Sequence, residues 1–140
     1  MKLLRNILAV VVGLVVGGAV NMALVIASPH AIPPPAGVDV TDPESLSASI
    51  HLFEPKHFIF PFLAHALGTL VGALVAYLIA ASHRPVFAYV IGACFLAGGI
   101  AAARMIPAPT WFVVLDLAVA YVPMAFLGTV LGRRMAGPKP

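Results

Sequence analysis

The stretch FIFPFLAHALGTLVGALVAYLIAA, residues 58–81, contains no Asp, Glu, Lys or Arg. An α-helix rises about 1.5 Å per residue, so about 20 apolar residues cover the roughly 30 Å hydrocarbon core of a bilayer. This stretch is therefore long enough to cross a membrane as a helix. The apolar stretches 7–27, 87–106 and 111–131 are of similar length and carry at most one charged residue each.

The composition points to a membrane protein without a separate soluble domain. The 140 residues are 61% hydrophobic and 9% charged, whereas a soluble domain carries roughly 25% charged residues. We predict a single all-α transmembrane domain over residues 1–140, a polytopic four-transmembrane-helix antiparallel bundle.

The basic residues predict the orientation of this bundle. If four spans alternate, six of the eight Lys and Arg residues fall on the side of the two termini. Because Lys and Arg near span ends are retained in the cytoplasm, both termini are predicted to be cytoplasmic. The same residues explain the sequence pI of 9.4 without nucleic acid as a partner. The six residues are Lys2, Arg5, Arg84, Arg133, Arg134 and Lys139.

The connection 28–57 is then extracytoplasmic and holds most of the acidic residues. Thr41 and Glu44 have the spacing of a capping box, which starts a helix. Apolar residues recur behind them at intervals of four and three residues. We predict a short amphipathic helix over residues 42–53, lying on the membrane surface, and a disordered tail over residues 132–140. The apolar face of that helix comprises Leu46, Ile50 and Phe53.

Small residues at helical spacing predict where the spans pack against one another. Packing drives helix association in lipid, and small residues let two backbones approach closely. On this basis a face of the third span, with Ala93, Ala97, Ala101 and Arg104, is also predicted to face its neighbours. The glycines predicted to lie in helix contacts are Gly13, Gly17, Gly68, Gly72, Gly92 and Gly99.

Four polar residues lie inside the spans at a similar depth: Asn21, His65, Arg104 and Asp116. Counted at about 1.5 Å per residue, each lies within roughly 10 Å of the outer edge of the hydrocarbon. A charged side chain at the bilayer centre costs at least about 2.5–3.5 kcal/mol. We therefore predict that these residues form a polar cluster inside the outer half of the bundle.

Three interpretations of this cluster are open. In the first it is structural: Arg104 and Asp116 form an ion pair that orients the last two spans, with His65 and Asn21 hydrogen-bonded nearby. In the second it is a binding or permeation site that opens outwards. In the third it is a catalytic acid–base group, with His65 as the proton carrier and Asp116 as its orienter.

No metal site or cofactor is predicted. His51, Glu54 and His57 offer ligand types that suit zinc, but they are weak candidates because Pro55 interrupts the helix that would align them. No phosphate-binding loop, nucleophile elbow or zinc-protease motif is present in the sequence. The single Cys94 excludes an intramolecular disulfide.

Three strings carry a resemblance to known sequences: PPPAGVD at 33–39 with DPESL at 42–46, GTLVGA at 68–73, and MIPAPTWF at 105–112. Along most of its length the chain resembles a group of small bacterial four-span integral membrane proteins. That resemblance implies a location in the cell inner membrane and a four-helix architecture. No activity is assigned to that group, so no catalytic residue follows from it.

The leading functional hypothesis is a non-enzymatic structural or accessory subunit, because no catalytic signature is present. Its partners would be the lipid bilayer and either further copies of the chain or another membrane protein. One rival is a small oligomeric transporter or channel with an outward-facing polar site. The other is a membrane-embedded enzyme that uses His65 and Asp116.

The orientation is testable by cysteine labelling in intact cells. A cysteine at Ser47 should react with a membrane-impermeant maleimide added from outside, and a cysteine at Ala136 should not, because the two positions lie on opposite sides of the predicted bundle. The reverse pattern would contradict the predicted orientation.

Overall fold

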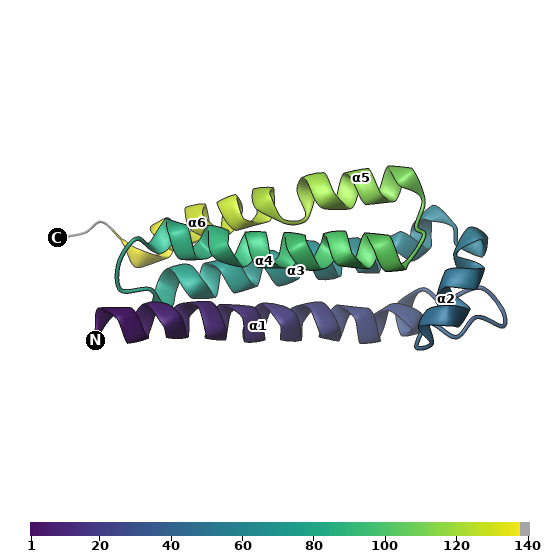
Figure 1. The fold of residues 1–140 in the computed structure, drawn as a ribbon, viewed down its shortest axis with the longest axis horizontal. Coiled ribbons are helices and arrows are strands. Elements are labelled where there is room, and N and C mark those ends of the chain that lie inside the picture. Colours follow the sequence, from purple (N-terminus) through teal and green to yellow (C-terminus); the bar gives the residue numbers. More distant parts are fainter. Residues whose placement is uncertain (138–140) are drawn as a thin grey trace.

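The computed structural model describes residues 1–137, which form helices and short connections with no strand among them. The long helices lie lengthwise beside one another, with α2 at the end opposite the two termini (Figure 1). Four helical segments are long and apolar enough to cross a membrane: Lys2–Ala31, Pro55–Ile79, Arg84–Met105 and Thr110–Ala136. The predicted all-helical class and its four apolar helices are confirmed. The elements are α1 (Lys2–Ala31), α2 (Pro43–Ser49), the 3₁₀ turns η1 (Ile50–Leu52) and η2 (Pro55–Phe58), α3 (Ile59–Ile79), α4 (Arg84–Met105), α5 (Thr110–Val119) and α6 (Val122–Ala136).

Helices α1 and α3 meet backbone to backbone along their glycines. A Cβ atom added at Gly17 would lie 2.6 Å from the carbonyl oxygen of Gly68, and one at Gly72 would lie 2.7 Å from that of Gly13. Since carbon and oxygen atoms that are not bonded do not approach so closely, only glycine fits at these positions. The buried face of α1 continues at Ala9, which is fully buried. One face of α1 therefore packs against α3.

Helix α4 packs through a different face from the one predicted. Ala93, Ala97 and Ala101 are exposed, so the prediction that this alanine face contacts other helices is wrong. The buried face instead carries one alanine, one isoleucine and two glycines: Ala88, Ile91, Gly92 and Gly99. Alanine spacing misled because an alanine packs as readily against lipid as against a helix, whereas a glycine in contact with a side chain marks the interface.

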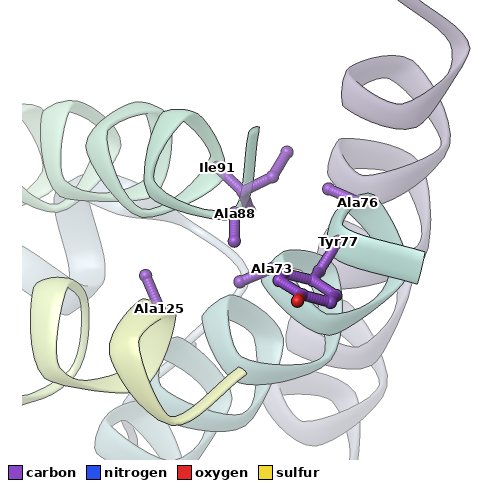
Figure 2. Close-up of a cluster of buried hydrophobic side chains, with 6 residues drawn as sticks. All are labelled: Ala73, Ala76, Tyr77, Ala88, Ile91 and Ala125. Carbon is purple, nitrogen blue, oxygen red and sulfur yellow. The ribbon is translucent and has the colours of Figure 1, made fainter. Parts of the chain in front are cut away.

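The half of the structure nearer the termini contains a packed cluster of mostly apolar side chains. Figure 2 shows its side chains converging from α3, α4 and α6, and all are less than 10% exposed. The ring of Tyr77 lies against Gly132, where any Cβ atom would collide with it. The buried Thr129 of this half donates its hydroxyl to the carbonyl of Ala125, one turn earlier in α6. The cluster comprises Ala73, Ala76, Tyr77, Ala88, Ile91 and Ala125.

The fourth apolar stretch is broken into two helices, whereas the sequence predicted one continuous span over residues 111–131. Pro123 is the second residue of α6. Its nitrogen carries no hydrogen, so it cannot donate to the carbonyl of Val119, four residues earlier. Helix α5 ends there, and Ala120 and Tyr121 form the connection to α6.

The connection before α3 also differs from its prediction. The helix α2 ends at Ser49, and its N-terminal cap is Asp42, whose carboxylate accepts from the amides of Glu44 and Ser45. Thr41 does not cap it; its hydroxyl donates to Asp39 over 2.6 Å, and this hydrogen bond lowers the pKa of the Asp39 carboxyl.

The end that holds the termini is tied together by Asn6. Its carbonyl oxygen accepts from the amide of Ala81 over 2.8 Å, and its Nδ2 donates to the Ser82 hydroxyl over 3.0 Å. Helix α6 continues to Ala136 beside this turn, so the predicted disorder over residues 132–140 is wrong for residues 132–136. Residues 138–140 lie outside the described residues.

The glycine seam gives a stability prediction. Gly17→Ala places a methyl group against the Gly68 carbonyl and should cost about 1–3 kcal/mol of unfolding free energy, as overpacking does. The control is Gly18→Ala one residue along, where a Cβ atom meets nothing within 4 Å. Thermal unfolding in detergent should show a loss for the first variant alone; equal melting temperatures for both would contradict the seam.

Candidate functional site

The centre of the candidate site is a contact between α3 and α5. His65 lies in the second turn of α3, and its Nδ1 is 2.9 Å and 3.0 Å from the two carboxylate oxygens of Asp116 on α5. Asp116 is 4% exposed. A carboxylate buried to this degree needs hydrogen-bond donors, because leaving its charge unpaired in an apolar surrounding is costly. The His65 Nδ1–H group supplies one such donor.

Tyr121 supplies the second donor from the break between α5 and α6. Its hydroxyl donates to Oδ2 of Asp116 over 2.9 Å, and its side chain is 1% exposed. The rings of Tyr121 and His65 stack with centroids 5.7 Å apart. Gly99 of α4 lies directly against the Tyr121 hydroxyl, so any side chain at that position would displace it.

These contacts decide which ring nitrogen of His65 is free. Since the carboxylate accepts only, Nδ1 must carry the hydrogen that it donates. In the neutral imidazole Nε2 is then a hydrogen-bond acceptor, and it has no hydrogen-bond partner among residues 1–137. The hydroxyl of Thr69, one turn later in α3, donates to the backbone carbonyl of His65 over 2.8 Å and does not contact the ring nitrogens.

Two cavities meet at His65. One, of about 290 Å³, is lined by α1, α3, α4 and Tyr121, and includes Asn21 and Cys94. The other, of about 230 Å³, lies beneath α2 and η1 and reaches Asp116. Its walls are apolar except for the two histidines and the carboxylate; Leu46, Ile50 and Phe53, the predicted apolar face, form its lid.

Asn21 lies near this group but is not hydrogen-bonded to it. Its Oδ1 is buried and has no donor among residues 1–137. The residue packs against Gly68, where an added Cβ atom would lie 3.0 Å from the Asn21 Cβ. Asn21 and His65 line the same cavity, so the structure places these two predicted residues together.

Arg104 does not belong to this group. The expected Arg104–Asp116 ion pair is wrong: Asp116 bonds to His65 and Tyr121, while Arg104 is exposed in the last turn of α4 and has no carboxylate within 4 Å among the described residues. Tyr121 and His65 reach Asp116 because α5 turns that carboxylate towards α3. An exposed guanidinium keeps its hydration, which favours the outward position.

Two of the three weak metal candidates, His57 and Glu54, make contacts within the connection before α3 instead. His57 accepts from the amide of Glu54 at Nδ1, over 2.9 Å, and its Nε2 donates to the carbonyl of Pro33, over 3.1 Å. Both ring nitrogens are thereby occupied. Glu54 pairs with Lys56 over 3.2 Å, and His51 is exposed. Within residues 1–137 no three His, Cys, Asp or Glu side chains are grouped to hold a metal ion.

Two features of the site were not predicted from the sequence: the hydrogen bond from Tyr121 to Asp116, and the contact of Gly99 with the Tyr121 hydroxyl. The available signal was Pro123, which breaks a helix and frees the residues just before it from regular geometry. A tyrosine two residues ahead of such a proline, in an apolar stretch that also contains an aspartate, is a candidate donor for that aspartate.

The hydrogen-bond network predicts a pattern of coupled mutations. Tyr121→Phe should cost about 1 kcal/mol of unfolding free energy, the usual size of a polar contact between membrane helices. In an Asp116→Ala background the same change should cost nothing, because its acceptor has gone. Arg104→Gln should have the same effect in both backgrounds. Thermal unfolding in detergent measures all of these, with the exposed Tyr89→Phe as a control; equal losses for Tyr121→Phe and Tyr89→Phe would refute the network.

Comparison with known protein families, with curated proteins and with solved structures finds no match to this chain. The resemblance to small bacterial four-span proteins therefore stays a hypothesis that rests on the quoted strings. Any function has to be argued from the site itself: a buried carboxylate with two donors, and a histidine that lines two cavities and has one ring nitrogen without a hydrogen-bond partner among the described residues.

Proposed function

We propose that the protein is a multi-pass protein of the cell inner membrane, a four-helix antiparallel bundle with both termini in the cytoplasm. The four apolar helices and the basic residues near their termini-side ends support this proposal. In this arrangement α2 lies over the outer mouth of the bundle, and the His65–Asp116 contact lies in the outer half of the bilayer.

Within the membrane, the bundle acts as a non-enzymatic accessory module. One observation carries this proposal: both carboxylate oxygens of Asp116 are engaged by donors from other parts of the bundle, namely His65 of α3 and Tyr121 at the α5–α6 break. A carboxylate that is hydrogen-bonded in this way fixes how the helices are oriented relative to one another. Neither of its oxygens is left without a hydrogen bond for a passing ion to bind.

The transporter alternative is favoured by the cavities that reach His65. It requires a continuation towards the cytoplasm. A cavity at the termini end, lined by Tyr77 and Arg84 among others, shares no lining residue with the two cavities at His65. The apolar cluster around Tyr77, Ile91 and Ala125 packs in that half of the chain, so a continuous path would have to run between copies of the chain or appear on rearrangement. This observation favours the accessory role over transport.

The enzymatic alternative is favoured by the His65–Asp116 contact, which has the arrangement of a general base and its orienting carboxylate. Catalysis would further require a substrate group beside Nε2 and stabilisation of the charge that develops on it. The part of the chain described here offers no cationic side chain among those lining either cavity at His65.

Ion flux separates the accessory role from transport. Proteoliposomes that contain the purified protein and a pH-sensitive dye should relax an imposed proton or potassium gradient no faster than protein-free vesicles, because the inner half of the bundle is packed. His65→Phe should lower thermal stability and leave this flux unchanged. A faster flux that the His65→Phe substitution abolishes would favour the transporter instead.

A further inference from the structure

The cavity beside Asn21 opens sideways, between helices α1 and α4. Its lining comes from Leu14 and Asn21 on one side and from Cys94, Phe95 and Gly98 on the other, with His65 and Tyr121 behind them. Cys94 is exposed, and a Cβ atom at Gly98 meets nothing within 4 Å. Helix α1 packs against α3 along the glycine seam, and the space between α1 and α4 is left unfilled.

The position of this opening determines what can reach it. If the bundle spans the membrane as proposed, Gly98 lies seven residues before the outer end of α4 at Met105, which is about 10 Å inside that end at 1.5 Å per residue. The opening then faces lipid chains. Only a molecule dissolved in the bilayer has direct access to His65 from this side.

Two acceptors that have no donor within residues 1–137 lie on residues that line the opening. His65 Nε2 presents a lone pair, because Nδ1–H is fixed on Asp116. The His65 side chain is 25% exposed. The carbonyl oxygen of Asn21 has no donor among the described residues, so the amide can turn towards one without breaking an existing hydrogen bond. The side-chain amide of Asn21 also carries N–H donors, so the site suits a neutral head group that can both donate and accept.

The Asp116 carboxylate behind His65 adds a charge argument. An anionic head group at Nε2 would lie close to this carboxylate, and the two charges would repel in a region of low dielectric. A cationic head group would have to lose its hydration in the hydrocarbon, at a cost of several kcal/mol, while the carboxylate already accepts hydrogen bonds from His65 and Tyr121. A neutral donor avoids both costs.

From these contacts we propose that the groove between α1 and α4 binds a lipid-soluble molecule with a neutral hydroxyl head, which donates its hydrogen to Nε2 of His65. The chain of the ligand lies along Leu14 and Phe95, and its polar end reaches the meeting point of the two cavities. This inference rests on the proposed insertion in the membrane, but it does not depend on the accessory role.

The test uses a photoreactive fatty alcohol. The protein is reconstituted in phosphatidylcholine vesicles, its insertion is checked by resistance to carbonate extraction, and 1-hexadecanol with a mid-chain diazirine is photolysed in the bilayer. We expect labelling of the α4 peptide that contains Phe95 and Gly98. Unlabelled hexadecanol should compete, and its methyl ether, which has the same chain and no donor, should compete at least about fivefold less well, the value of one hydrogen bond.

Two variants locate the site. Gly98→Leu places a bulky side chain in the opening, at a position where the added Cβ meets nothing within 4 Å, and should abolish the specific labelling. Gly18→Leu, at another glycine whose Cβ would meet nothing within 4 Å, should leave the labelling unchanged. His65→Phe removes the acceptor and should abolish the preference of the site for the alcohol over the ether. Gly98→Leu keeps the test valid if His65→Phe does not fold.

Other outcomes overturn the proposal. Equal competition by alcohol and ether in inserted protein means that the groove holds lipid chains without a head-group preference. Rapid Cys94–Cys94 crosslinking with no labelling means that a second copy covers the groove. Protein that carbonate extracts from the vesicles contradicts the proposed membrane insertion itself, which distinguishes that failure from failure of the ligand site.

Discussion

A carboxylate buried among apolar helices is the constraint on which the candidate site depends. Asp116 is almost fully enclosed, and an unpaired charge there would cost several kcal/mol. Its two hydrogen-bond donors come from other parts of the fold: His65 from α3, and Tyr121 from the break between α5 and α6. Gly99 then has to be a glycine, because the Tyr121 hydroxyl occupies the space of its side chain.

The glycine seam and the polar contact hold different pairs of helices together. The seam holds α1 against α3 over Gly13, Gly17, Gly68 and Gly72, through van der Waals contact alone. The polar contact joins α3 to α5 and to the start of α6. Neither of these two contacts joins α1 to α4 in the half of the molecule towards α2, and the lateral opening lies between those two helices. The opening is thus a consequence of which pairs of helices carry close contacts.

Periodicity and composition were sufficient for the helices and insufficient for their partners. Four apolar stretches of helical length predict helices, because a helix satisfies its backbone hydrogen bonds within one segment, and the first three stretches are single long helices. Residue spacing alone does not reveal which face turns inwards. Thus the glycines of α1 and α3 lie in a helix contact, whereas Ala93, Ala97 and Ala101 are exposed, since alanine is compatible with either neighbour.

The same limit explains the partner of Asp116. Arg104 was the expected partner because it is the nearest opposite charge along the chain, across the turn between α4 and α5. The structure pairs Asp116 with a histidine 51 residues away and with a tyrosine five residues on. The first depends on how α5 is rotated against α3, which no local pattern encodes; the second depends on a helix break whose only local signal is Pro123.

The break at Pro123 connects the fold to the site. In a continuous helix, Tyr121 would lie five residues from Asp116, which places it about 140° around the axis, and the two side chains would point to different sides. Ending α5 before Tyr121 removes that restriction, and the hydroxyl returns to the carboxylate over 2.9 Å. The Tyr121 ring then stacks on His65 and limits how the imidazole can turn. The position of the imidazole beside the two cavities therefore depends on a proline that lines neither of them.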